Sequence, residues 1–191
     1  RPILQSLARA CAALGLRAVT QIGNLRGSPH PNLLCIGEEP HAEIFPRVRA
    51  VIHHGGAGTT GTVARAGVPS VVVPHFADQF YWGRRLHALG VAARPVPRTV
   101  ASTALLTRRL EQATATPMRQ RAADLADRVR DEDGCGLAVR RVEQWVTGPD
   151  AGHGDALGGD GARGDAARGD VDIATRAGEF GARGDVVEWE A

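Results

Sequence analysis

The 191-residue sequence contains no lysine, and its positive charge comes from 23 arginines. This absence excludes the phosphate-binding loop of ATPases, in which a lysine follows the glycines and reaches the phosphates. The three cysteines (Cys11, Cys35 and Cys135) are widely spaced, which indicates reduced thiols rather than disulfides or a zinc motif. No apolar run approaches the ~18 residues of a membrane span, and no signal-peptide pattern is present. We therefore expect a cytoplasmic protein without a metal or other cofactor.

The composition predicts a folded domain over residues 1–147 and a disordered tail over residues 148–191. Hydrophobic residues make up 43% of the chain, enough for a core. From residue 148 onward, Gly, Ala, Asp and Arg dominate without a period of 2 or 3.6. The tail holds 4 arginines against 10 acidic residues, and the domain holds 19 against 11. The domain's arginines are spread along several amphipathic segments, which argues against a nucleic-acid surface.

Short strands alternate with helices over the expected domain. Apolar β-branched runs predict strands at 17–22, 32–36, 50–54, 70–73 and 91–94. Helical spacing and helix-boundary residues predict helices at about 2–14, 41–47, 58–66, 76–89, 102–113, 116–131 and 136–145, with Ser102 and Thr116 as N-caps. This alternation predicts a Rossmann-like doubly wound parallel sheet in the α/β class, with helices on both faces. Such sheets bind ligands beyond the carboxyl ends of their strands.

The most distinctive segment is Val51-Ile-His-His-Gly-Gly-Ala-Gly-Thr-Thr-Gly61, where an apolar strand breaks into a glycine-rich turn and then a helix. Glycine lets the backbone approach a ligand closely, and the start of a helix presents N–H groups at the positive end of its dipole. The segment therefore predicts an anion site, for which a diphosphate is the natural ligand.

The same glycines also fit a dinucleotide-binding fold. Residues 56–61 satisfy G-x-G-x-x-G, and Asp78 follows Gly56 by 22 residues, near the ~20 expected for a ribose-binding acid. An NAD(P)-dependent reductase domain is thus an alternative, although Asp78 falls in a loop and His53 and His54 would have no role in hydride transfer. A zinc site at these histidines is not expected, because adjacent strand residues point to opposite faces.

Residues 53–85 resemble the donor-binding signature of family 1 nucleotide-sugar glycosyltransferases, especially the bacterial antibiotic and sterol glucosyltransferase branch. The match couples the HHGGAGTT turn, the AGVP turn and the pair Asp78 and Gln79 at the family's spacing, and residues 40–47 resemble the same branch. Similarity continues more loosely to Trp145 and does not include the tail. The resemblance implies the C-terminal half of a GT-B fold, here without its first strand.

The resemblance also implies roles for matching residues. The glycine turn and helix start would hold the donor's diphosphate without a metal, using His54, Gly56, Gly58, Thr59 and Thr60. Asp78 and Gln79 would hydrogen-bond the sugar hydroxyls.

The nucleoside would lie beside Glu39, Pro40 and His41. Plant members of the family place a base-stacking tryptophan where this chain has Glu38 and a ribose-binding glutamate where it has Thr62. The base is therefore open, and UDP- and dTDP-sugars are both possible donors.

Structural roles compete with several of these assignments. His53 is expected to pack in the core, on the strand face opposite His54. Asp78 has the alternative of capping the following helix. The aromatic residues 80–82 suit either a sugar pocket or hydrophobic anchoring, and His75 and His87 suit the surface or packing.

By resemblance, the function is the inverting transfer of a hexose from a UDP- or dTDP-sugar to a hydroxyl of a lipid-like, sterol-like or polyketide acceptor. The general base and acceptor site of such enzymes belong to an N-terminal domain that these 191 residues do not contain. We therefore expect no catalytic residue in this chain and no activity from the chain by itself. A non-catalytic nucleotide-sugar-binding remnant is the second alternative.

Overall fold

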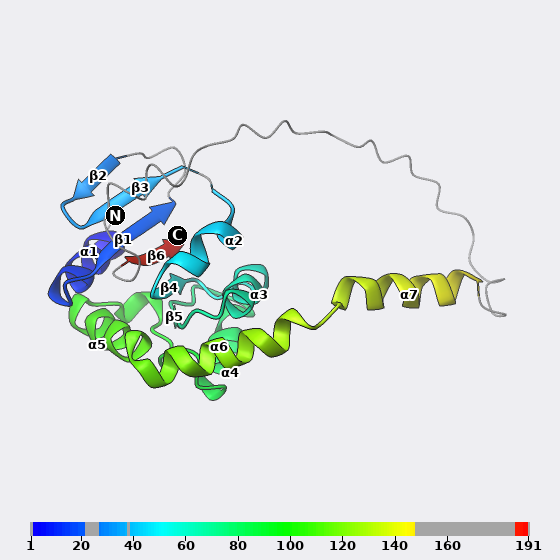
Figure 1. The fold of residues 1–191 in the computed structure, drawn as a ribbon. Helices are drawn as coiled ribbons and strands as arrows, with labels where there is room; N and C mark the ends of the chain where they lie inside the picture. Colours follow the sequence, from blue (N-terminus) through cyan, green and yellow to red (C-terminus); the bar gives the residue numbers. More distant parts are fainter. Residues whose placement is uncertain (1, 22–26, 38, 148–185, 191) are drawn as a thin grey trace. The chain divides into compact units, whose positions relative to one another are not determined.

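The sheet has the strand order β2-β3-β1-β6-β4-β5 (Figure 1). Its strands are β1 (Arg17–Gln21), β2 (Gly27–His30), β3 (Leu33–Ile36), β4 (Ala50–His53), β5 (Ser70–Val72) and β6 (Val186–Glu190). All neighbouring strands are parallel except β2 and β3. The structure is a computed structural model that describes residues 2–21, 27–37, 39–147 and 186–190.

Helices cover both faces of this sheet. They are α1 (Pro2–Ala13), α2 (His41–Ile44), α3 (Ala57–Ala66), α4 (Gln79–Ala88), α5 (Thr103–Thr114) and α6 (Thr116–Arg130), with 3-10 turns η1 (Phe45–Arg47) and η2 (Arg98–Val100). Helix α1 packs against α5, and α3 packs against α6 (Figure 1). The predicted doubly wound α/β fold is confirmed.

Separate hydrophobic clusters fill the two sides of the sheet. In β4, Ile52 packs with the cluster of α1 and α5, whereas Val51 packs with Val63 of α3. In β5, Val71 belongs to the first cluster and Val72 to one formed with α4 and α6. Because side chains alternate between faces, a strand covered on both sides must be apolar at successive positions.

Of the two predicted helix N-caps, one is confirmed and one is wrong. Ser102 caps α5 as predicted, and its Oγ accepts from the Leu105 N–H at 3.3 Å. The prediction that Thr116 caps α6 is wrong, because α6 already includes Thr116 and its N-cap is Ala115. Ala115 is the single residue between α5 and α6, so its backbone serves both helix ends.

Two short segments also differ from expectation. Residues 27–30 were expected in a loop but form β2, an antiparallel edge strand that accommodates Pro29 because an edge strand can leave ladder positions unpaired. Residues 91–94 were expected as a strand but contribute only an isolated bridge between Ala92 and Ser70. Both results depend on which partner lies alongside, which local sequence does not specify.

Strand β6 lies between β1 and β4 and pairs in parallel with both. The expectation of a disordered tail therefore does not hold for residues 186–190, and the sheet has a strand at this central position. Val-Val-Glu-Trp-Glu contains β-branched and aromatic residues that favour a strand. The edges of β1 and β4 supply partners that a composition argument cannot anticipate. Residues 148–185 lie outside the described residues.

Helix α7 (Gly134–Thr147) belongs to a second unit and confirms the predicted last helix. Asp133 stabilises its start: one carboxylate oxygen accepts from the Gly136 N–H at 2.9 Å, and the other lies 3.4 Å from Arg140. Among the helices that the structure describes, none is long and apolar enough to cross a membrane.

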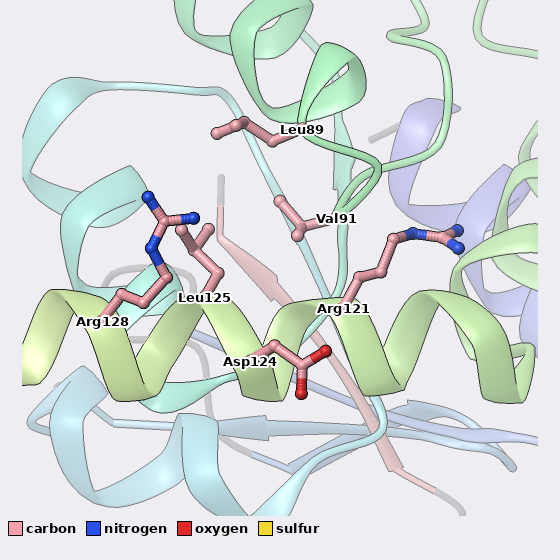
Figure 2. A pocket seen from close by; sticks show the side chains of 6 residues that line it. All are labelled: Leu89, Val91, Arg121, Asp124, Leu125 and Arg128. Atoms are coloured by element: carbon pink, nitrogen blue, oxygen red, sulfur yellow. The ribbon is translucent and has the colours of Figure 1, made fainter.

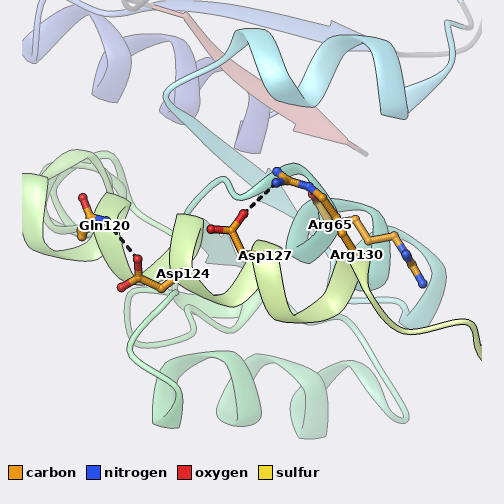
Figure 3. A network of polar contacts seen from close by, with 5 residues as sticks. All are labelled: Arg65, Gln120, Asp124, Asp127 and Arg130. Carbon is orange, nitrogen blue, oxygen red and sulfur yellow. Dashed lines mark hydrogen bonds and ion pairs between the residues drawn. The ribbon is translucent and has the colours of Figure 1, made fainter.

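A polar network on α6 reaches the end of α3 (Figure 3). Gln120 donates to Asp124 at 2.9 Å, and Arg130 pairs with Asp127 at 2.9 Å. Arg130 Nε also donates to the backbone carbonyl of Arg65 at 3.1 Å. Exposed ion pairs contribute at most about 1 kcal/mol, so the network mainly fixes the end of α3 against α6.

Candidate functional site

Two loops leave the same edge of the sheet, because β4 and β5 are parallel neighbours. The first is the glycine turn between β4 and α3, and the second joins β5 to α4. Gly55 has φ +92°, and a Cβ there would lie 3.0 Å from the carbonyl oxygen of Gln79 and 2.7 Å from Val72. The glycine turn therefore packs directly on the start of α4. The segment predicted for the diphosphate and the segment predicted for the sugar thus lie next to each other.

His54 lies over the start of α3. The residue is half-buried, and a Cβ added to Gly56 would lie 2.5 Å from its Nε2 atom. Gly56 is the N-cap of α3 and offers no side chain of its own. The absence of a side chain at Gly56 thus leaves the space in which the imidazole stands beside the helix N-terminus.

The first turn of α3 supplies further donors. Its first intrahelical bond runs from the Thr60 N–H to the Gly56 carbonyl at 2.9 Å, so the earlier amides have no acceptor within the helix. The Thr60 hydroxyl is buried and has no hydrogen-bond partner among the described residues, whereas the Thr62 hydroxyl donates to the Gly58 carbonyl at 3.1 Å. A buried hydroxyl without a partner next to a helix N-terminus is typical of a place that a ligand or water completes.

His53 is a core residue, as predicted. Its side chain is fully buried, and Nε2 lies 3.2 Å from the Ser70 hydroxyl. Burial, followed by the nearby imidazoles of His54 and His41, lowers the pKa of His53 to about 3. The imidazole is therefore neutral at physiological pH and takes no part in an exposed anion site.

His75 joins the site although sequence reasoning left it on the surface or in packing. Its ring centroid lies 6.5 Å from that of His54, and its Nε2 is buried without a partner in the structure. Burial, followed by the charges of Arg98 and His54, lowers the pKa of His75. The sequence position of His75 could have indicated this, because His75 follows β5 as His54 follows β4.

Asp78 is exposed in the second loop, and its carboxylate is held from one side. Its Oδ2 accepts a hydrogen bond from the indole Nε1 of Trp82 at 3.0 Å. The expectation that Asp78 could cap α4 is wrong, since its side chain makes no capping bond. The preceding Ala77 has φ +52°, an uncommon conformation for a residue with a side chain. The Asp78 carboxylate is thus exposed in the loop and does not cap the N-terminus of α4.

Gln79 is buried and holds the loop in shape. Its Oε1 accepts from the backbone N–H groups of His75 at 2.7 Å and Phe76 at 3.1 Å. This role was not foreseen from the sequence. With Oε1 engaged, the side-chain NH₂ is the part of Gln79 that can serve a ligand.

The segment predicted for the nucleoside is tied to the carboxyl end of β1. Gln21 donates to the Glu39 carbonyl at 3.1 Å and accepts from the Glu39 N–H at 3.2 Å. Pro40 precedes α2, and the ring of His41 stacks on Phe45 at 4.8 Å. Gln21 thus positions this segment, a role that the sequence analysis missed. The clue in the sequence was a polar side chain at the end of a predicted strand.

A hollow of about 190 Å³ lies elsewhere, beside α6 (Figure 2). Its lining consists of Leu89, Val91, Arg121, Asp124, Leu125 and Arg128. The Val91 carbonyl accepts from the Ser70 N–H at 3.1 Å, which puts this hollow at the amino end of β5. It is separate from the two loops at the carboxyl ends.

The two loops define a recognisable class: a Rossmann-like domain whose carboxyl edge brings two imidazoles and a helix N-terminus beside a carboxylate and a side-chain amide. Residues 12–142 match the family described as erythromycin biosynthesis protein CIII-like, C-terminal domain. The chain belongs to this family. Among the described residues, no three His, Cys, Asp or Glu side chains gather as a metal site requires.

Curated relatives of the chain are glycosyltransferases. A sterol 3-beta-glucosyltransferase of Arabidopsis thaliana is 36% identical over 118 residues, which are 62% of this chain and 19% of the relative. The O-mycaminosyltylonolide 6-deoxyallosyltransferase of Streptomyces fradiae is 37% identical over 138 residues, 72% of this chain and 33% of the relative. The chain thus spans a third or less of the length of these two proteins.

Solved structures similar to the chain are also glycosyltransferases. The spinosyn rhamnosyltransferase SpnG complexed with thymidine diphosphate superposes with a TM-score of 0.65 and 26% identity, over 74% of this chain and 40% of that protein. The glycotransferase of kitacinnamycin has a TM-score of 0.66 at 24% identity, over 75% and 39%, which supports the fold. The predicted resemblance to the donor-binding half of family 1 glycosyltransferases is confirmed, and a nicotinamide-dependent reductase is not favoured.

Proposed function

We propose that the chain is the donor-binding part of an inverting glycosyltransferase that moves a hexose from a UDP- or dTDP-sugar to a hydroxyl of a lipid-like, sterol-like or polyketide acceptor. The observation that carries this proposal is the packing of the His54 glycine turn on the loop that presents Asp78. A diphosphate and a sugar are joined in the donor, so their binding groups must lie together.

The diphosphate would lie at the start of α3. His54 would donate to one phosphate, and the first amides of the helix, with Gly56, Gly58 and Thr59, would surround its oxygens. The buried hydroxyl of Thr60 adds a donor that lacks a partner in the structure. As the bond between sugar and phosphate breaks, negative charge grows on the departing diphosphate, and these fixed donors stabilise it without requiring a metal.

The sugar would be held by the second loop. Asp78 would accept hydrogen bonds from hydroxyls, and the amide NH₂ of Gln79 would donate one. These contacts fix the anomeric carbon for attack from the opposite face, which gives inversion.

The nucleoside would lie beside Glu39, Pro40 and His41, which Gln21 anchors to β1. Glu38, the position of the stacking tryptophan in plant relatives, lies outside the described residues. The Thr62 hydroxyl is bonded to a helix carbonyl, so it offers little to a ribose. We keep uridine and thymidine as candidate nucleosides, and the thymidine diphosphate in the SpnG structure supports the second.

The acceptor site and general base are proposed to belong to a domain outside these residues, in keeping with the greater length of the relatives. The sterol and macrolide relatives support a large apolar acceptor. The chain by itself would bind a donor and transfer nothing, and a non-catalytic binding module would behave in the same way in a binding assay. Activity restored by an acceptor domain supplied with the chain would separate the two.

Calorimetric titration of the full chain tests donor binding. UDP or dTDP should bind in the presence of EDTA, and His54→Ala should weaken binding tenfold to a hundredfold because a hydrogen bond to a charged phosphate is lost. His87→Ala, on the exposed side of α4, is the control and should bind like the wild type. Binding of NAD with no response to either nucleoside diphosphate would overturn the proposal.

The cysteines support a reducing compartment such as the cytoplasm, since Cys11, Cys35 and Cys135 are all free. Burial raises the pKa of Cys11 to about 12 and also raises that of Cys35. A chromogenic disulfide reagent should therefore label Cys135 at least a hundredfold faster than the other two in the native chain, and all three after unfolding. Equal labelling of all three thiols in native protein would contradict the packing of α1 and β3.

A further inference from the structure

We propose that Trp82 is a positioning residue for the donor's sugar, because its indole N–H fixes the carboxylate of Asp78. The inference rests on the proposed function and deepens it. The hydrogen bond from Trp82 Nε1 to Asp78 Oδ2 measures 3.0 Å and joins the loop before α4 to the first turns of that helix. Among the residues that the structure describes, no other side-chain hydrogen bond or ion pair involves the Asp78 carboxylate.

The spacing explains why tryptophan suits this place. Asp78 is the N-cap position of α4, and Trp82 lies four residues later, one helical turn along the same side. The backbone bond from the Trp82 N–H to the Asp78 carbonyl, at 3.0 Å, sets this turn. An indole combines a large apolar ring with an uncharged N–H donor at its edge. Trp82 can therefore hold the carboxylate without adding a charge that would compete with a ligand.

The backbone around Asp78 is also held in place. Gln79 fixes the backbone amides of His75 and Phe76, and Gly83 packs against Pro95 with no room for a larger residue. An aspartate side chain in such a rigid loop still rotates about its own bonds. The indole removes that freedom, so the rotamer is chosen before a sugar arrives.

A pre-set carboxylate affects sugar binding and leaves diphosphate binding unchanged. Oδ2 is partly used by the indole, and Oδ1 retains its full capacity to accept from a hydroxyl. Loss of the indole would let the carboxylate rotate toward water. Binding a sugar would then have to fix the carboxylate, and this entropic cost would weaken the affinity. The diphosphate contacts at α3 involve other atoms.

The test compares the binding of nucleoside diphosphates with the binding of the corresponding nucleotide sugars. The full chain, with Trp82→Phe, Asp78→Asn and Trp145→Phe as variants, is titrated by calorimetry with dTDP, dTDP-glucose, UDP and UDP-glucose. Trp82→Phe keeps an aromatic ring beside Tyr81 and removes the N–H donor together with part of the ring. Trp145→Phe makes the same chemical change in α7 and is the matched control. Thermal melting of each variant verifies that it is folded.

The expected result is selective. Trp82→Phe should weaken binding of the nucleotide sugar about tenfold and change binding of the nucleoside diphosphate less than twofold. Asp78→Asn should weaken nucleotide-sugar binding more than Trp82→Phe does, because Asp78 also contacts the sugar directly. The double variant should add little to Asp78→Asn alone, because Trp82 acts through Asp78. The indole N–H resonance that Trp82→Phe removes from the NMR spectrum should move in Asp78→Asn.

Three outcomes overturn the inference in distinguishable ways. Equal loss of affinity for diphosphate and nucleotide sugar in Trp82→Phe would assign Trp82 a purely structural role. Wild-type affinity of that variant for both ligands would mean that the hydrogen bond has no part in binding. Absence of binding of every nucleotide by the wild type would remove the proposed function itself, and the inference with it.

Discussion

Gly56→Ala should weaken binding of UDP or dTDP at least tenfold while leaving the stability of the fold nearly unchanged. The added Cβ would lie 2.5 Å from Nε2 of His54 and 3.3 Å from two ring carbons. The end of a flexible side chain can move away at little energetic cost, so the imidazole should leave the helix N-terminus. The backbone gains no strain, because Gly56 has φ −61° and ψ 147°, values that alanine adopts freely.

Two other glycines of the same segment serve as controls. Gly61→Ala, inside α3, meets no atom within 4 Å and should bind nucleotide normally, with a gain of up to about 1 kcal/mol from helix propensity. Gly55→Ala should lower the melting temperature, because φ is +92° and the new Cβ would lie 3.0 Å from a backbone carbonyl. Calorimetric titration and thermal melting of the three variants measure both effects. Normal binding by Gly56→Ala would show that His54 does not contact the diphosphate.

The sequence predicted the glycine turn well because its signals are local. An apolar strand, paired glycines and a helix start follow one another within residues 51–61, and each is determined by neighbouring residues. The separate roles of His53 and His54 also followed from strand alternation, and the burial of His53 agrees.

The parts that were missed depend on contacts across turns or between distant strands. Gln21 was unremarkable until β1 and the segment at Glu39 lay side by side. Gln79 was assigned to a ligand, but the turn before α4 uses its oxygen for backbone amides. Strand β6 pairs with β1 and β4 from the other end of the chain, and no local pattern indicates such a partner. The contact between Trp82 and Asp78 differs from these, because the two residues are only one helical turn apart. It could have been predicted from the sequence once the start of α4 was known.

His53 should make the folded domain sensitive to acid. In the folded chain the pKa of its imidazole is about 3, mainly because of burial and then because of His54 and His41. In the unfolded chain the ordinary pKa is about 6.5. Between these values the unfolded state binds a proton that the folded state does not. Stability from this residue is thus fully present above about pH 6.5 and is lost as the pH falls toward 3.

The size of the effect is large for one side chain. A difference of this size corresponds to on the order of 4 kcal/mol by pH 3, comparable to the total stability of many small domains. His53→Asn keeps a polar side chain that does not titrate, but it loses the Nε2 atom that lies 3.2 Å from the Ser70 hydroxyl. It should be less stable than the wild type at pH 7, because the smaller side chain leaves a cavity in the core. Its free energy of unfolding should then fall much less between pH 6.5 and pH 4.

Urea unfolding followed by circular dichroism at half-unit pH steps measures these slopes. Carboxylates also take up protons as the pH falls, so the informative quantity is the difference in slope between the wild type and His53→Asn. Parallel curves for the wild type and His53→Asn would mean that His53 gains its proton as easily in the folded chain as in the unfolded one. That result would contradict a fully buried imidazole beneath the glycine turn.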